Sequence, residues 1–374
     1  MSLRTNPAPV PRSCNECAYH NICGGWDDER FKEGCFQKCA DCFSETCDYT
    51  CPVNPTLFVK SVEEVGGLGR LPNRLSSIGI GEANLPSYIP QIDHGASRRY
   101  VLSEPVVSIP FNRLCRISRS GRIQLIHRTR ESLLRSFKLA NNTRIIITCV
   151  TKDHWIEGLY QARKEILPLV KILEPIAVTV PNFSFVRNSP RTNSVWNQTK
   201  GFKLIEDMTD EKLPVVPHLQ AQTSRDWSRL EELFKNFPHA QHACMEFQTG
   251  LNRQDSKYPS REIYKKHFQD FQQSTGGRVH PIVLAGYREV DFLKEVCPSF
   301  SIIDANVFVK TVNRQVAHYS GVGRRRWGRA SFAESQDLSQ LLQSNISKER
   351  DFFLRNTGMG IDGKPLNPLL LPAA

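Results

Sequence analysis

The stretch Arg144-Ile-Ile-Ile-Thr-Cys-Val150 decides the fold class. It is a short, β-branched run, which predicts a buried strand. The next segment, Trp155 to Leu173, has a polar start and apolar residues three or four positions apart, which predicts a helix. A second aliphatic run, Ile176 to Pro181, follows that helix. Strand, helix and strand in this order are the repeating unit of a parallel sheet.

The same rhythm extends in both directions along the chain. Further strands are predicted at Tyr88 to Asp93, Val106 to Phe111, Leu213 to Leu219, Ala243 to Gln248, Pro281 to Gly286 and Ser301 to Asp304. Helical periodicity covers Ser224 to Phe234, Ser260 to Gln273 and Glu289 to Val296. Together these runs predict an α/β protein, a TIM-like (β/α)8 barrel with a small N-terminal Cys-rich metal-binding module.

Length and composition limit the classes of protein that are possible. The 374 residues are 40% hydrophobic, enough for one large or two ordinary domains with real cores. No run approaches the roughly 18 apolar residues of a membrane helix, and the opening residues lack the apolar run of an export signal. We therefore expect a cytoplasmic protein with no membrane partner. The formal net charge of +11 favours a polyanionic partner.

Cysteine placement divides the chain. A Cys-rich module is predicted over residues 1–55, a connecting and covering segment over 56–87, the barrel over 88–330, and a C-terminal helix and tail over 331–374. The first region has too few aliphatic residues to fold on its core alone. Its eight cysteines are Cys14, Cys17, Cys23, Cys35, Cys39, Cys42, Cys47 and Cys51.

Eight thiolates make two four-ligand sites. Disulfides are disfavoured in a reducing compartment, so the spacing predicts two metal centres, each held by four cysteines, that contain Zn²⁺ or [4Fe-4S] clusters. Metal binding would supply the folding energy that the segment lacks. Within the module, Cys35-x3-Cys39-x2-Cys42 also has the spacing of radical S-adenosylmethionine enzymes, which leaves an iron–sulfur radical enzyme as an alternative.

Polar residues, most of them acids, amides and histidines, stand where the predicted strands stop. In a (β/α) barrel the active site is built at the carboxyl ends of the strands, so this pattern predicts one convergent pocket. The residues in question are Asp93, His94, Lys152, Asp153, Asn182, His218, Gln220, Gln222, Glu246, Gln248, Asp304 and Asn306.

The order of several motifs resembles the tRNA-guanine transglycosylase superfamily over roughly residues 88 to 330. The motifs are Gln220-Ala-Gln222 with Asp226, then Glu246 at a strand end, then Gly286 with Glu289, then Asp304 followed by Lys310 and Arg314. The family's C-terminal zinc segment is missing, which suggests a divergent member, similar to the relatives that insert 7-deazaguanine bases into DNA.

The resemblance implies a role for each matching position. Asp304 stands where the family has its nucleophilic aspartate, and Asp93 resembles its second catalytic acid. Asn182 falls at the position of a base-reading aspartate. Gln220, Glu246, Gln248 and Gly286 match segments that bind the base. The implied reaction exchanges a base in DNA or tRNA for a small free base such as a 7-deazaguanine, through a covalent intermediate on an aspartate.

Positive charge is concentrated in two stretches. Arg113 to Lys138 holds eight Lys or Arg against one acid, and Lys310 to Arg329 holds six against none. Such clusters neutralise phosphates, and an interleaved tryptophan stacks on a base. The predicted nucleic-acid contacts are Lys310, Arg314, Arg324, Arg325, Arg326 and Trp327. A non-catalytic, metal-stabilised nucleic-acid-binding protein is the remaining alternative.

Overall fold

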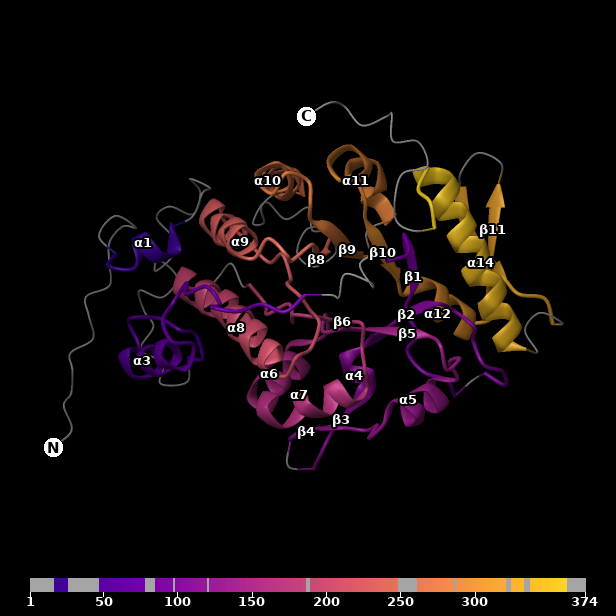
Figure 1. Cartoon of the computed structure of the whole chain (residues 1–374), viewed down its shortest axis with the longest axis horizontal. Coiled ribbons are helices and arrows are strands. Elements are labelled where there is room, and N and C mark those ends of the chain that lie inside the picture. The colour runs from indigo at the N-terminus through magenta and orange to yellow at the C-terminus, as the bar shows by residue number, and fades with distance from the viewer. Residues whose placement is uncertain are drawn as a thin grey trace.

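The computed structural model is a mixed α/β fold built on parallel sheets (Figure 1). It describes residues 17–25, 47–77, 85–96, 98–119, 121–185, 189–247, 261–285, 287–320, 324–332 and 337–361. One four-stranded sheet has the order β1 (Tyr88–Pro90), β10 (Ser301–Asp304), β9 (His280–Leu284) and β8 (His242–Glu246). The other has the order β2 (Val106–Pro110), β5 (Arg144–Thr148), β6 (Ala177–Thr179) and β7 (Val215–Val216). All eight predicted strands are present, and every pairing within these two sheets is parallel.

Isolated parallel bridges join the two sheets at both edges. Gln91 pairs with Ser108, so β1 lies next to β2 in space. His218 pairs with Cys244, so β7 lies next to β8. Backbone hydrogen bonds of 2.8 Å, from Ile92 N to the Ser108 carbonyl and from Leu219 N to the Cys244 carbonyl, support both bridges.

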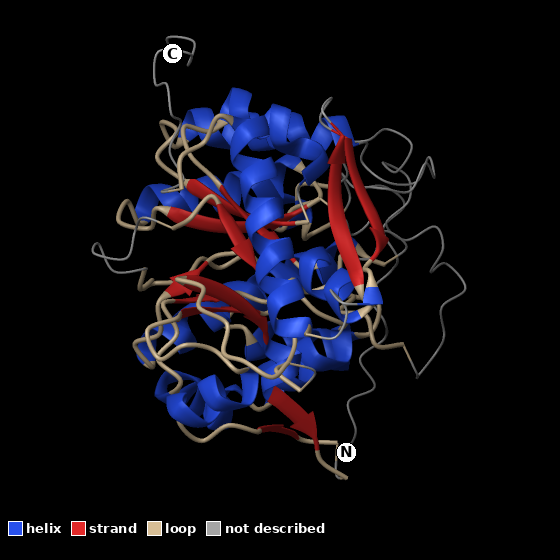
Figure 2. Cartoon of the chain, turned by 90° about the vertical axis from the view of Figure 1, so that its right-hand side faces the viewer, coloured by secondary structure: helices blue, strands red, loops and turns tan. Residues whose placement is uncertain are grey.

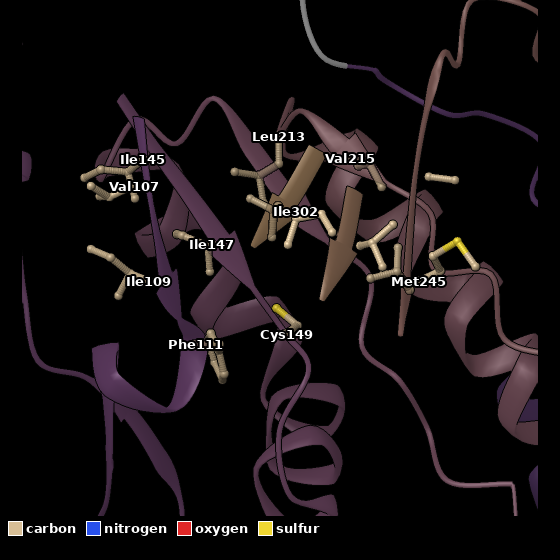
Figure 3. Packing of buried hydrophobic residues seen from close by; sticks show 14 of the residues in the cluster. Val107, Ile109, Phe111, Ile145, Ile147, Cys149, Leu213, Val215, Met245 and Ile302 are labelled. Carbon is tan, nitrogen blue, oxygen red and sulfur yellow. The ribbon is translucent and has the colours of Figure 1, made fainter. Parts of the chain in front are cut away.

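Buried side chains form two main clusters because both faces of the strands are covered. In the larger cluster, which we call the strand–helix cluster, alternate strand residues such as Ile145 and Ile147 pack against the helices (Figure 3). The strand-only cluster takes the residues between them, including Ile146. Every strand of the two sheets contributes to it, with residues that include Ile89, Val106, Ile146, Ala177, Val216, Cys244, Ile282 and Ile303. We call the strand face that carries this cluster the inner face.

Helices surround the strands (Figure 1). The longer ones are α5 (Arg130–Phe137), α6 (Asp153–Gln161), α7 (Arg163–Ile172), α8 (Arg191–Asp210), α9 (Ser224–Asn236), α10 (Arg261–Ser274), α11 (Val290–Val296), α12 (Asn306–Val312) and α14 (Leu338–Thr357). The predicted helix over Trp155 to Leu173 is two helices, because the backbone leaves helical geometry at Ala162. α9 begins with a capping box in which Thr223 and Asp226 bond each other's backbone N–H groups.

Two antiparallel hairpins lie outside the parallel sheets (Figure 2). The short one, β3 (Cys115–Ile117) with β4 (Ile123–Leu125), directly follows helix α4 (Phe111–Leu114) and hence β2. The long one, β11 (Gln315–Ser320) with β12 (Arg324–Arg329), lies along α14. Near the N-terminus are two further helices, α1 (His20–Cys23) and α3 (Pro55–Glu64), and a 3-10 turn, η4 (Tyr287–Glu289), precedes α11.

Candidate active site

Three strand ends meet at Asn182. Its side-chain amide donates to Glu246 Oε1 at 2.9 Å, and its Oδ1 accepts from the Thr151 backbone N–H at 3.3 Å. Thr151 follows β5, Asn182 follows β6, and Glu246 ends β8. Because Cys244 belongs to the strand-only cluster, Glu246 two residues later is also on the inner face. The structure thus brings together two of the residues that the sequence predicted to read a base.

Asp93 stands at the same end of the strands, after β1. Its Oδ1 accepts from Gln91 Nε2 at 3.1 Å, and Gln91 is two residues beyond Ile89 on the inner face. Arg113 holds the other oxygen with two donors, Nη2 at 2.8 Å and Nε at 3.2 Å. The Asp93 side chain is 15% exposed. This carboxylate therefore has a cationic partner and retains access to solvent.

The two predicted glutamines are used locally. Gln220 donates its side-chain amide to the Phe183 carbonyl, and Gln222 donates to the Phe185 carbonyl at 3.2 Å. Both bonds hold the segment after Asn182 in place. Gln220 is therefore near the Asn182–Glu246 pair, with an amide already engaged by backbone.

Asp304 is placed differently from the sequence prediction. Ile303 belongs to the strand-only cluster, so the next residue faces the opposite side of β10, toward the helices. Its carboxylate accepts from Tyr88 Oη at 3.0 Å and from the Asn306 backbone N–H at 2.8 Å. Burial, with the nearby charge of Glu349, raises the pKa of Asp304 to about 6. The structure does not place this side chain on the inner face with Glu246.

The β11–β12 arginines are also placed differently. α14 begins near the site end of β1, since Leu338 and Leu342 share a small cavity with His94, and it ends near the start of β1, where Ser87 bonds Gly360. The hairpin follows α14 in the same direction: Val316 packs with Leu338, whereas Tyr319 stacks on Phe352. Its tip therefore points away from the site.

Several side chains of this hairpin are already engaged within the protein. Arg325 Nη1 pairs with Glu349 Oε2 at 2.9 Å, and Trp327 is half-buried against the strand–helix cluster. Arg326 and Arg314 are exposed, and Lys310 is half-buried on α12. Arg324 is a strand residue whose backbone pairs with Ser320. Those of the predicted nucleic-acid contacts whose side chains the structure describes do not form one surface at the site.

Several predicted residues lie outside the described part of the chain. These are Gln248, Gly286, Cys14, Cys35, Cys39 and Cys42. Of the remaining module cysteines, Cys23 and Cys51 are buried, and Cys17 and Cys47 are half-buried. Within the described ranges, no three His, Cys, Asp or Glu side chains come together as metal ligands. The two four-cysteine centres and the radical alternative therefore stay predictions from the sequence.

The described cysteine segments dock on the N-terminal ends of α8 and α9. Arg191 donates to the Cys23 carbonyl at 3.3 Å, and Arg229 donates to the Ile22 carbonyl at 2.9 Å. Arg191 also reaches Gln222 Oε1 at 3.4 Å. Since the helices that cover a parallel sheet begin where its strands end, the described segments of the module adjoin the site edge.

Sequence reasoning gave no individual role to two residues that the structure places at this edge, Arg113 and the strand-end His218. Arg113 was recognised only as part of a basic stretch, and its pairing with Asp93 depends on helix α4, which directly follows β2. His218 is nine-tenths buried, and neither ring nitrogen has a hydrogen-bond partner among the described residues. Burial lowers its pKa to about 4. A strand-end histidine was the only available signal.

Comparisons with known proteins give no family. No family model matches the chain, and no curated protein matches it. Among solved structures, a protein of Coccidioides immitis, provisionally described as a fructose-1,6-biphosphate aldolase, has a TM-score of 0.34 at 10% identity, covering 74% of this chain and 93% of its own. A mandelate oxidase mutant has a TM-score of 0.32 at 12% identity, covering 82% and 87%. Likenesses this weak carry no inference about activity.

None of the helices in the described ranges is both long and apolar enough to cross a membrane.

Proposed function

We propose that this protein is an enzyme that exchanges a base in a nucleic acid, on a closed (β/α)8 barrel. Closure of the barrel is supported by the two isolated bridges and by the strand-only cluster, to which all eight strands contribute. The active site of such a barrel lies at the carboxyl ends of the strands. Asp93 and Glu246 occupy that end.

The observation that carries the proposal is that two carboxyl groups from different strands stand at one end of the parallel sheets. Asp93, after β1, is held by the Arg113 guanidinium at 2.8 Å, and Glu246, at the end of β8, accepts from the Asn182 amide at 2.9 Å. Base exchange needs one group that attacks C1′ and a second group that transfers protons to and from the bases. We assign the attack to Asp93, whose side chain is 15% exposed, and the proton transfer to Glu246, which is bonded to the predicted base-binding residue Asn182.

The reaction can be written on these residues. An Asp93 oxygen attacks C1′ of the target nucleotide, the bond from C1′ to the base nitrogen breaks, and Glu246 in its acid form protonates that nitrogen. Asp93 is then joined to C1′ as an ester. The incoming base gives its nitrogen-bound proton to the Glu246 carboxylate and attacks C1′, which releases Asp93. Atoms and charges balance over the cycle.

The preferred base is one with neighbouring N–H donors on its edge. The Asn182–Glu246 pair carries the acceptor oxygens of an amide and a carboxylate, and Glu246 Oε1 accepts from Asn182. Guanine and 7-deazaguanine carry adjacent N–H donors that match a carboxylate. Together with the family resemblance, this supports a 7-deazaguanine as the incoming base, with DNA or tRNA as the acceptor. We also propose, from the cysteine spacing, that the N-terminal module holds two four-cysteine metal centres, which take no part in this step.

Trapping of a covalent adduct tests the proposal. Wild-type protein incubated with oligonucleotides should form an adduct that survives denaturing electrophoresis, and Asp93→Asn should lose it because the amide is a poor nucleophile. Asp304→Asn serves as the matched control and should keep the adduct.

Two outcomes would contradict the proposal. Loss of the adduct in Asp304→Asn but not in Asp93→Asn would show that Asp304, at the end of β10, is the nucleophile. If the wild-type protein neither forms an adduct nor incorporates labelled base into DNA or tRNA, the proposed base exchange is refuted.

A further inference from the structure

The β3–β4 hairpin is the most uniformly cationic element near the site. No Asp or Glu occurs between Pro105 and Arg130. Five arginines of this region are exposed: Arg113, Arg116, Arg119, Arg122 and Arg128. Apart from Arg113, none of them forms an ion pair with a carboxylate in the described ranges, and Arg116 bonds only the neutral Gln124, at 3.3 Å. The positive charge of the hairpin is therefore directed to solvent.

The hairpin is held firmly although its arginines are exposed. Cys115, Ile123 and Leu125 are buried in the strand–helix cluster, and Ile123 packs closely over Gly158 of α6. Ile126 N also bonds the Leu114 carbonyl at 2.8 Å. Anchoring of this kind fixes the arginine side chains on a rigid platform, which lowers the entropy lost when a ligand binds.

The base of the hairpin is attached to the site. Arg113 is in the short helix α4 that separates β2 from β3, and its guanidinium bonds Asp93. By contrast, β11–β12 extends away from the site and pairs Arg325 with Glu349 on α14. Of the two basic stretches in the sequence, the first one therefore has its first residue, Arg113, beside the candidate nucleophile.

We propose that β3–β4 binds the phosphate backbone of a double helix and so presents the target nucleotide to Asp93; this rests on the proposed function. Exposed arginines without acids suit phosphates. Proteins that bind single strands add aromatic side chains on which bases stack. From Pro105 to Arg130 the only Phe, Tyr or Trp is Phe111, which is buried, so the hairpin offers backbone contacts rather than stacking.

A charge-reversal variant tests this interface without touching the site. Arg116→Glu, Arg119→Glu and Arg122→Glu are combined in the full-length protein, leaving Arg113 intact. The matched control, Lys171→Glu with Lys235→Glu and Lys266→Glu, makes the same change in net charge at exposed positions on α7, α9 and α10. Fluorescence anisotropy measures the Kd for duplex DNA, an RNA stem-loop and single-stranded DNA over a salt series. Circular dichroism confirms that both variants fold.

The hairpin variant should bind a duplex at least about tenfold more weakly than the control. The slope of log K against log salt should fall by about 0.9 for each phosphate that the variant no longer neutralises. Comparison of the wild-type Kd for duplex DNA and for the RNA stem-loop shows whether the bound phosphate backbone belongs to DNA or to RNA. Equal duplex binding by the two variants, or a single strand bound as tightly as a duplex, would overturn the inference. Normal duplex binding by a wild type that forms no adduct would refute the proposed chemistry and leave the interface standing.

Discussion

At the scale of single residues, the site depends on which face of a strand a side chain takes. Glu246 is on the inner face and Asp93 bonds the inner-face Gln91, whereas Asp304 is one residue past the inner-face Ile303 and points to the helices. A shift of one position along a strand reverses the side to which every side chain points. The motif that resembles the transglycosylase nucleophile therefore fits the family order, while its carboxylate is bound to Tyr88 in a buried layer.

Two histidines with lowered pKa values, His218 and His280, predict how stability depends on pH. Burial lowers the pKa of His218 to about 4 and that of His280 to about 3, against about 6.5 in an unfolded chain. Below pH 6.5 the unfolded state binds protons that the folded state rejects, so stability is full above pH 6.5 and falls as the pH drops toward 4.

Replacing one histidine should reduce this dependence. His218→Gln should lower the slope of unfolding free energy against pH, between pH 7 and 5, by up to about 1.4 kcal/mol per pH unit. Urea denaturation across that range measures it. His318→Gln, at an exposed position, is the control and should leave the slope unchanged. An unchanged slope in His218→Gln would show that this imidazole titrates normally in the folded protein.

At the scale of elements, α8 and α9 are joined by a buried ion pair. Arg191 Nη2 lies 2.7 Å from Asp226 Oδ1, and Arg229 Nη2 lies 3.1 Å from the same oxygen. Burial alone would raise the pKa of Asp226, but the two arginines outweigh burial and hold the pKa below its ordinary value. The same arginines bind the carbonyls of Cys23 and Ile22.

Removing one partner should be costly. Arg191→Met should lower the free energy of unfolding by about 3–5 kcal/mol, because the Asp226 carboxylate stays buried with only one of its two arginine partners. It should also make the segment from residue 17 to 25 more sensitive to protease. Arg74→Met, which breaks the half-exposed pair with Asp210, should change stability far less. Equal effects of the two substitutions in urea denaturation would show that burial of the pair does not matter.

At the scale of the molecule, the strand-only cluster makes both sheets depend on one core. Ile146 belongs to the β2-β5-β6-β7 sheet and Ile282 to the β1-β10-β9-β8 sheet, and both side chains are fully buried in that cluster. If the barrel is closed, neither sheet can lose its inner contacts without exposing those of the other. Unfolding should then be a single cooperative transition.

Large-to-small substitutions test closure. Ile146→Ala and Ile282→Ala should each destabilise the protein by about 2–5 kcal/mol and shift the same transition. Circular dichroism and tryptophan fluorescence should report coincident midpoints. Ile117→Ala, at a position 44% exposed on β3, should have a smaller effect. Two separate transitions, each moved by only one of the buried substitutions, would contradict a shared core.

The sequence by itself determined the strand order along the chain, because buried parallel strands are read as short aliphatic runs whatever their partners. It also determined the polar strand ends that include Asp93, Asn182 and Glu246. Helix α8 was not predicted from the sequence. Fifteen of its twenty residues are buried, and they include polar ones such as Lys200 and Glu206, so the helix has no apolar stripe.

Only the tertiary structure decided which acids meet and which basic stretch adjoins them. The face that a side chain takes depends on register between strands far apart in sequence, which removed Asp304 from the inner face. The direction of a hairpin depends on the helix it packs against, so β11–β12 follows α14 away from the site, while Arg113 ties β3–β4 to Asp93. Such long-range contacts leave no local signature, because no short segment contains both partners.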